Sequence, residues 1–225
     1  MRTYLDPTAP IAPDAILTDD PKVAMDLAVA ICELPRMSNL AHGLWGYYGT
    51  TRDGCAVTVQ SLGIGGPSAA AVMADLARLG VARAIRIGSC ISLEAGLGRG
   101  SSFVATGFEP RDGAGIALSE GRHLKPDPGL TQALKDATGA QSSDLVRSTD
   151  IVSPDAEAGG ASVLDLSSAA FAASCATAGV SYACALVIAR GTDGSALSPE
   201  ALDDAVISLG KRAASVLGGV PQASA

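Results

Sequence analysis

Aromatic and charged residues are scarce in this chain. Of its 225 residues, 4% are aromatic and 17% are charged, and the chain has two histidines and one tryptophan. The net charge is −7, and no basic stripe is present that would hold nucleic acid or an acidic membrane surface. We therefore expect a small-molecule ligand as the partner, with no nucleic-acid and no membrane contact.

Cysteines are also few, and their arrangement argues against a disulfide framework. The five cysteines are odd in number, widely spaced and set among apolar neighbours, so we interpret them as reduced core residues. The N-terminal segment has no apolar signal core and is interrupted by prolines. These features favour a cytoplasmic protein. We expect neither a metal site nor a cofactor.

Long hydrophobic runs are absent except in one place. No charged residue occurs between Asp165 and Arg190, and this run is long enough to cross a bilayer. Gly179 and several serines interrupt it, and β-type residues follow from Val180. We predict a buried helix followed by a buried strand in this region.

What the chain does contain is a pattern of alternating strands and helices. Its length fits a single domain over residues 1–225, which can bury about 70% of the unfolded surface. The alternation predicts a three-layer α/β fold with a mainly parallel or mixed sheet. Predicted strands cover residues 15–18, 45–51, 55–62, 81–88, 145–147 and 182–189. Residues 99–107 contain a further predicted strand, and residues 162–166 form a strand or a turn. Predicted helices cover residues 21–34, 67–79, 128–137, 168–178 and 199–216, with a polar connection at 35–44 and a glycine-rich excursion at 109–127.

Residues 61–98 form the most informative unit, a strand, a glycine turn, a helix and a second strand. Gly63 and Gly65 belong to the turn, where the backbone can approach a ligand closely. Arg86 lies in an otherwise apolar strand, so its charge needs a partner or a ligand. Two interpretations remain open. Arg86 and Ser89 form an anion pocket with the helix start, or Arg86 pairs with an internal carboxylate.

Four segments of the chain resemble the purine nucleoside and uridine phosphorylase family, in family order and at family spacing. They are residues 15–28, 43–80, 82–93 and 163–172. The resemblance implies a three-layer α/β/α nucleoside phosphorylase-like fold with a mixed, partly barrel-like central sheet. It also implies a homo-oligomer, a dimer or a trimer of dimers, with sites near the subunit interface. The family's reaction is phosphorolysis of an N-glycosidic bond, which gives a base and a sugar 1-phosphate.

The resemblance implies a phosphate site, and the chain departs from the family pattern there. Where the family has Gly-Asp-Pro-x-Arg, Asp19 replaces the glycine and Val23 replaces the arginine. His42 stands where a second phosphate arginine typically reaches across the subunit interface. Arg86 and Ser89 match the family's Arg-x-Gly-Thr. Because guanidinium groups are lost and a carboxylate is added, we expect phosphate to bind poorly and Asp19 to pair with Arg86.

The sugar and base positions implied by the resemblance have changed as well. Ser167 stands where the family has a ribose-binding glutamate, and Arg190 stands where an aspartate protonates the purine, unless Asp193 turns inward to replace it. Ile91 replaces a glycine that leaves room for the base. Tyr4 takes the place of the family's N-terminal histidine.

Other positions complete the predicted pocket. Ile151 and Val152 follow the place where the family has an aromatic residue over the base, and Ile64 and Gly65 contribute the glycine turn. Lys22 is expected to point to solvent, because it lies one residue out of register with the missing arginine.

Three hypotheses follow from these departures. In the first, the pocket binds or converts a different small molecule, with His42, Asp19, Arg190 and Ser167 as catalytic candidates and His42 as an acid or base near neutral pH. In the second, the chain is a non-catalytic ligand-binding protein or partner subunit. In the third, a residual nucleoside hydrolase or phosphorylase activity persists. We favour the first.

Overall fold

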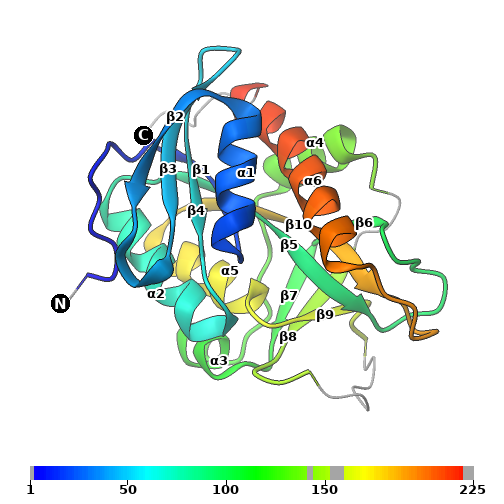
Figure 1. Cartoon of the computed structure of the whole chain (residues 1–225). Helices are drawn as coiled ribbons and strands as arrows, with labels where there is room; N and C mark the ends of the chain where they lie inside the picture. The colour runs from blue at the N-terminus through cyan, green and yellow to red at the C-terminus, as the bar shows by residue number, and fades with distance from the viewer. Residues whose placement is uncertain (1–2, 141–143, 153–159, 220–225) are drawn as a thin grey trace.

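The structure, a computed structural model, describes residues 3–140, 144–152 and 160–219 (Figure 1). In this part of the chain, ten strands and six α-helices alternate. The strands are β1 (Asp14–Thr18), β2 (Cys32–Asn39), β3 (Gly46–Thr51), β4 (Ala56–Ser61), β5 (Arg83–Ser92), β6 (Ser102–Val104), β7 (Gly107–Pro110), β8 (Leu145–Ser148), β9 (Val163–Asp165) and β10 (Ser181–Arg190). The helices are α1 (Pro21–Ile31), α2 (Gly65–Arg78), α3 (Gly113–Ser119), α4 (Pro128–Thr138), α5 (Ser168–Ala178) and α6 (Pro199–Gly219), with a 3₁₀ turn, η1 (Ala41–Gly43).

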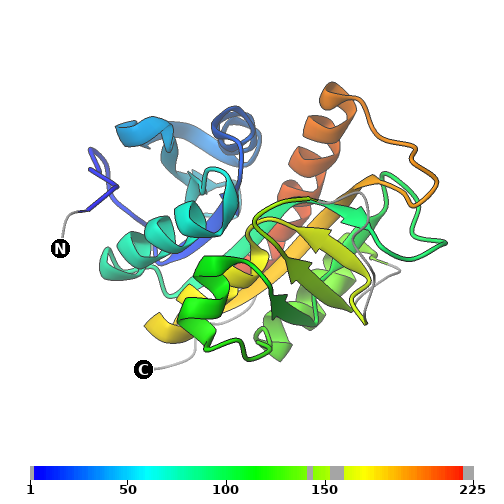
Figure 2. The same cartoon turned by 90° about the horizontal axis from the view of Figure 1, so that it is seen from below.

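All ten strands belong to one mixed sheet that branches at β5. The order is β2-β3-β4-β1-β5-β9-β8-β7, and β10 pairs with β5 and β6. The first half of β5 is parallel to both β1 and β10, whereas its last residues are antiparallel to β9. In Figure 2 the yellow-green strands β8 and β9 lie on the opposite side of β5 and β10 from the blue strands. This mixed sheet, curved about its branch, is the arrangement that the sequence predicted.

Helices cover both faces of the sheet, which gives the expected three layers. Helices α2, α3 and α5 pack together on one face, and α1, α4 and α6 pack on the other. Each face has its own apolar core. Phe171 and Leu76 belong to the core under α2 and α5, and Leu27, Leu134 and Leu209 belong to the other. The two cores lie on opposite faces of the sheet. Alternate residues of β5 point into different cores, because successive side chains of a strand point to opposite faces.

Side-chain caps account for several helix starts. The carboxylate of Asp20 accepts hydrogen bonds from the backbone N–H groups of Lys22 and Val23 at the start of α1. Asp127 caps α4 in the same way, through the N–H of Leu130. These caps confirm the predicted starts, because a side-chain acceptor satisfies an N–H group that the helix itself leaves free.

Three local predictions were wrong. Helix α1 was expected to extend through Leu34, but Leu34 lies in β2 and is 92% exposed, since the proline that follows it disfavours helix. In the segment at 35–44, expected to be a polar connection, residues 35–39 belong to β2 and residues 41–43 form η1. Within the glycine-rich excursion, a strand β7 and a helix α3 were missed, and α3 starts at the cap that Asp112 provides.

The charge-free run forms α5 and β10, as predicted. The first eight of the eleven residues of α5 are buried, and so is most of β10. Among the described residues, no helix is both long and apolar enough to cross a membrane. The five cysteines are free, but Cys32 and Cys55 are only half-buried, so the interpretation of all five as core residues was too broad.

Candidate functional site

A cavity of about 320 Å³ lies at the carboxyl ends of β1 and β5, between the first turns of α2 and α5. In an α/β sheet, this edge is where helix starts and strand ends bring polar groups together. The residues that line it are Asp19, Ile64, Gly65, Arg86, Ser89, Cys90, Ile91, Val152, Leu164, Asp165, Leu166, Ser167 and Ala189.

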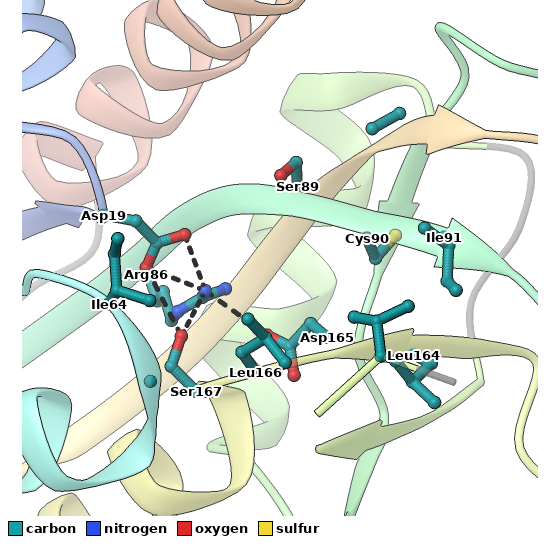
Figure 3. A pocket seen from close by; sticks show the side chains of 13 residues that line it. Asp19, Ile64, Arg86, Ser89, Cys90, Ile91, Leu164, Asp165, Leu166 and Ser167 are labelled. Carbon is teal, nitrogen blue, oxygen red and sulfur yellow. Dashed lines mark hydrogen bonds and ion pairs between the residues drawn. The ribbon is translucent and has the colours of Figure 1, made fainter. Parts of the chain in front are cut away.

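Arg86 occupies the polar end of this cavity and is fully buried. Its Nη2 lies 3.0 and 2.9 Å from the two carboxylate oxygens of Asp19 and donates to Ser167 Oγ at 2.7 Å. Its Nη1 donates to Ser168 Oγ at 2.9 Å. Asp165 Oδ2 lies 3.2 Å from Nη2. Figure 3 shows Asp19 and Ser167 converging on the guanidinium. Of the two interpretations of Arg86, the structure therefore shows the second, in which Arg86 pairs with an internal carboxylate.

The topology of the sheet explains this convergence. Strands β1 and β5 are parallel neighbours in which Leu17 lies opposite Arg86, so the chain leaving β1 carries Asp19 past the guanidinium. The same face of β5 is covered by α5, whose first residues carry Ser167 and Ser168. Residues far apart in sequence meet because each stands at the end of an element that reaches one edge of the sheet.

Asp165 lies on the buried side of the cluster formed by Arg86, Asp19 and the serines, and it is nearly inaccessible to solvent. Its Oδ1 accepts a hydrogen bond of 2.5 Å from Ser148 Oγ, and its Oδ2 accepts one of 2.5 Å from Ser168 Oγ. Oδ2 also accepts from the backbone N–H of Ser168 at 3.0 Å, at the start of α5. Ser148 Oγ in turn accepts from the N–H of Ala169. Asp165 thus replaces the side-chain cap that Ser167 does not supply.

Removing the hydroxyl of Ser148 tests this support. We expect Ser148→Ala to lower the free energy of unfolding by about 1–3 kcal/mol, because it removes the hydroxyl donor of a buried carboxylate oxygen and the acceptor of a buried N–H group. Urea denaturation followed by circular dichroism measures the change. Ser215→Ala is the control, since that exposed hydroxyl donates only within α6, and we expect a change of about 0.5 kcal/mol or less. Equal effects of the two substitutions would contradict the account.

Burial and charge together set the ionisation of the cluster. Burial lowers the pKa of Arg86, but the negative charges of Asp19 and Asp165 outweigh it and hold that pKa above its ordinary value. The guanidinium is therefore charged at neutral pH. Burial raises the pKa of Asp19, and the charge of Asp165 adds to this, whereas Arg86 opposes it. The cluster thus contains two carboxyl groups and one guanidinium.

The two cysteines of this region are not suited to act as nucleophiles. Burial raises the pKa of Cys184 to about 11, and it raises the pKa of Cys90 well above its ordinary value. Both thiols are therefore neutral near pH 7, and the thiolate is the reactive form. Among the residues the structure describes, no group of three or more potential ligands is placed to hold a metal ion.

The opposite end of the cavity is apolar. Figure 3 shows Cys90, Ile91 and Leu164 lying away from the guanidinium, along β5 and β9. Ile64, at the mouth, is 84% exposed, and Val152 is 42% exposed. A ligand that fills this cavity meets a polar end and an apolar wall.

Most of the site residues predicted from the sequence come together around this cavity. Those that line it are Asp19, Ser167, Arg86, Ser89, Ile64, Gly65, Ile91 and Val152. Lys22 does not approach it, because its ammonium pairs with Asp26 at 2.6 Å on the exposed side of α1. Val23 is buried in the core beneath α1 and α6.

Four predicted site residues are not part of the cavity lining: His42, Tyr4, Arg190 and Ile151. His42 is exposed in η1, where its φ of 57° is left-handed, and its ring lies 5.9 Å from that of Tyr4. Arg190 is exposed at the end of β10, and Ile151 is 78% exposed. Asp193 is exposed too and accepts hydrogen bonds from Ser195, so it does not turn inward in this structure.

The sequence reasoning missed five residues that line the cavity. They are Cys90, Leu164, Asp165, Leu166 and Ala189. Asp165 carried a usable signal, because it is the last residue of a buried strand and stands three residues before the first residue of a buried helix. A carboxylate in that position needs hydrogen-bond donors, and Ser168, which follows it, and Ser148, which precedes it, supply them.

The sheet order, the two helical layers and the edge cavity define an α/β protein of the nucleoside phosphorylase fold. The sequence model of the Phosphorylase superfamily matches residues 13–220, and the chain belongs to this family.

Two relatives illustrate the range of similarity. A guanosine phosphorylase of Halorubrum lacusprofundi is 43% identical over 61 residues, which are 27% of this chain and 25% of that protein. The match thus spans about a quarter of that relative's length. The crystal structure of purine nucleoside phosphorylase from Toxoplasma gondii in complex with immucillin-H superposes with a TM-score of 0.81 at 21% identity, covering 92% of each chain. At this identity the superposition shows the fold.

Proposed function

We propose that this protein uses the family pocket to bind or convert a small molecule other than the phosphate and nucleoside pair of phosphorolysis. One observation carries the proposal. The only guanidinium among the described residues that line the cavity, Arg86, is occupied by Asp19, Asp165 and two serine hydroxyls. An incoming phosphate would have to displace a carboxylate from a buried cation and would meet two negative charges at short range.

We also propose that the protein works as a homo-oligomer. His42 and Tyr4 lie in contact with each other on the surface, outside the cavity of their own protomer. A neighbouring subunit could place this pair at the mouth of its own cavity, which would complete a site that one chain leaves open. In such an arrangement, the His42 imidazole would be the candidate general acid or base of the neighbouring cavity.

Activity measurements test the proposed function directly. The protein is incubated with guanosine, inosine, adenosine and uridine, with and without inorganic phosphate, and release of the base is followed by liquid chromatography. We expect no phosphate-dependent release, because Asp19 and Ser167 already accept from Nη2 of Arg86, and its Nε, which has no partner, is buried. Robust release that rises with phosphate concentration would show that the pocket still performs phosphorolysis and would overturn the proposal.

A further inference from the structure

The charges around the cavity are unbalanced, and this imbalance selects the kind of ligand. Apart from the neutral thiol of Cys90, the described lining residues that ionise are Arg86, Asp19 and Asp165. Two carboxylates face one guanidinium, so the lining carries one negative charge in excess. Other basic residues of this region, Lys22 and Arg190, are exposed and do not line the cavity.

Only one of these three charges is open to a ligand. The side chains of Arg86 and Asp165 are each 1% exposed, whereas that of Asp19 is 32% exposed. Asp19 Oδ1 accepts from Arg86 and, at 3.3 Å, from Ser167, and Oδ2 accepts from Arg86. A carboxylate has about four acceptor positions, so Asp19 retains capacity for a further donor. What a ligand meets at the polar end is therefore a carboxylate.

The apolar wall of the cavity determines which part of a ligand lies away from Asp19. Ile64, Ile91, Val152 and Leu164 give the cavity an apolar surface, and the hydroxyl of Ser89 adds a polar group. The volume of about 320 Å³ suits a compact organic molecule. We propose that the cavity takes a cationic ligand, an ammonium or amidinium group on a compact apolar body, with Asp19 as its counter-ion. This inference rests on the proposed function, because a site that holds phosphate at Arg86 would have the opposite charge preference.

The pKa of Asp19 is compatible with this assignment. Burial and the charge of Asp165 raise it, whereas Arg86 lowers it. A bound cation stabilises the ionised form, and its affinity is therefore expected to rise with pH through the pKa of Asp19.

Three probes with the same body and different charge test the inference: benzylamine, benzyl alcohol and benzoate. Each is titrated into ¹⁵N-labelled protein, and amide shifts around the cavity report binding. We expect benzylamine to bind at least about tenfold more tightly than benzyl alcohol, and benzoate to bind least. Asp19→Asn should reduce benzylamine to the affinity of the alcohol. Asp26→Asn, which removes a carboxylate from α1 outside the cavity, should leave the preference unchanged.

Several results would overturn the inference. They are the absence of benzylamine binding at the cavity, benzoate binding as tightly as benzylamine, and a benzylamine preference that survives Asp19→Asn. The proposed function is judged separately by phosphate-dependent base release. Failure of the amine preference without such release rejects the ligand class alone, whereas phosphate-dependent release rejects the proposed function.

Discussion

Replacing Arg86 with methionine is expected to lower the free energy of unfolding by about 3–5 kcal/mol. Methionine preserves much of the apolar stem but leaves Asp165 in the interior without its cation, and Asp19 loses both of its contacts with Nη2. An uncompensated buried charge is one of the few mechanisms that produce losses of this size. Urea unfolding at neutral pH, followed by circular dichroism, measures the effect.

Arg190→Met provides the matched control for this substitution. It removes the same functional group from the exposed end of β10, where we expect a change of about 0.5 kcal/mol or less. The loss in Arg86→Met should also diminish in acid, because protonation of Asp19, whose pKa burial raises, removes one of the unpaired charges. A loss in Arg86→Met no larger than in Arg190→Met would mean that the cluster is not held together by its guanidinium.

Replacing Asp19 with glycine is expected to create an affinity for inorganic phosphate that the unaltered protein lacks. The substitution frees Nη2 of Arg86 from two contacts and removes the more exposed of the two negative charges. A single charge-assisted hydrogen bond contributes about 1.5–3 kcal/mol, so the phosphate affinity should rise by about tenfold or more. Isothermal titration calorimetry at low ionic strength measures it.

Asp26→Asn controls for the change in net charge, since it removes one carboxylate at a distance from the guanidinium. We expect that variant to bind phosphate as weakly as the unaltered protein. If Asp19→Gly showed no gain, the missing guanidinium groups at positions 23 and 42 would be the whole reason that phosphate binds poorly, and Asp19 would not be the blocking group.

The sequence predicted the elements well where a local signal marks them. Helix α5 matches its predicted range, and α1, α4 and α6 begin where Asp and Ser caps precede prolines. Helix α3 was missed because its seven residues include two glycines, so its cap was the only signal. The strand β2 was missed because exposed and buried residues do not alternate regularly along it.

The polar end of the site was predictable because its residues flank strong motifs. Arg86 lies in β5, and Asp19 directly follows β1, the parallel neighbour of β5. Ser167 precedes a recognisable helix. Asp165 and Ser148 were not assigned, since their role depends on the pairing of β8 with β9, which connects segments distant in sequence. The side-chain directions of His42 and Arg190 could not be read from motif position either, because each stands in a turn or at a strand end.

The central claim is that Asp19 occupies Arg86 and thereby excludes phosphate. The most direct test is an NMR titration of ¹⁵N-arginine-labelled protein with inorganic phosphate, with the Arg86 side-chain resonances assigned by the Arg86→Lys variant. We predict that these resonances do not shift in the unaltered protein and do shift in Asp19→Gly. A saturable phosphate-dependent shift of Arg86 in the unaltered protein would contradict the account.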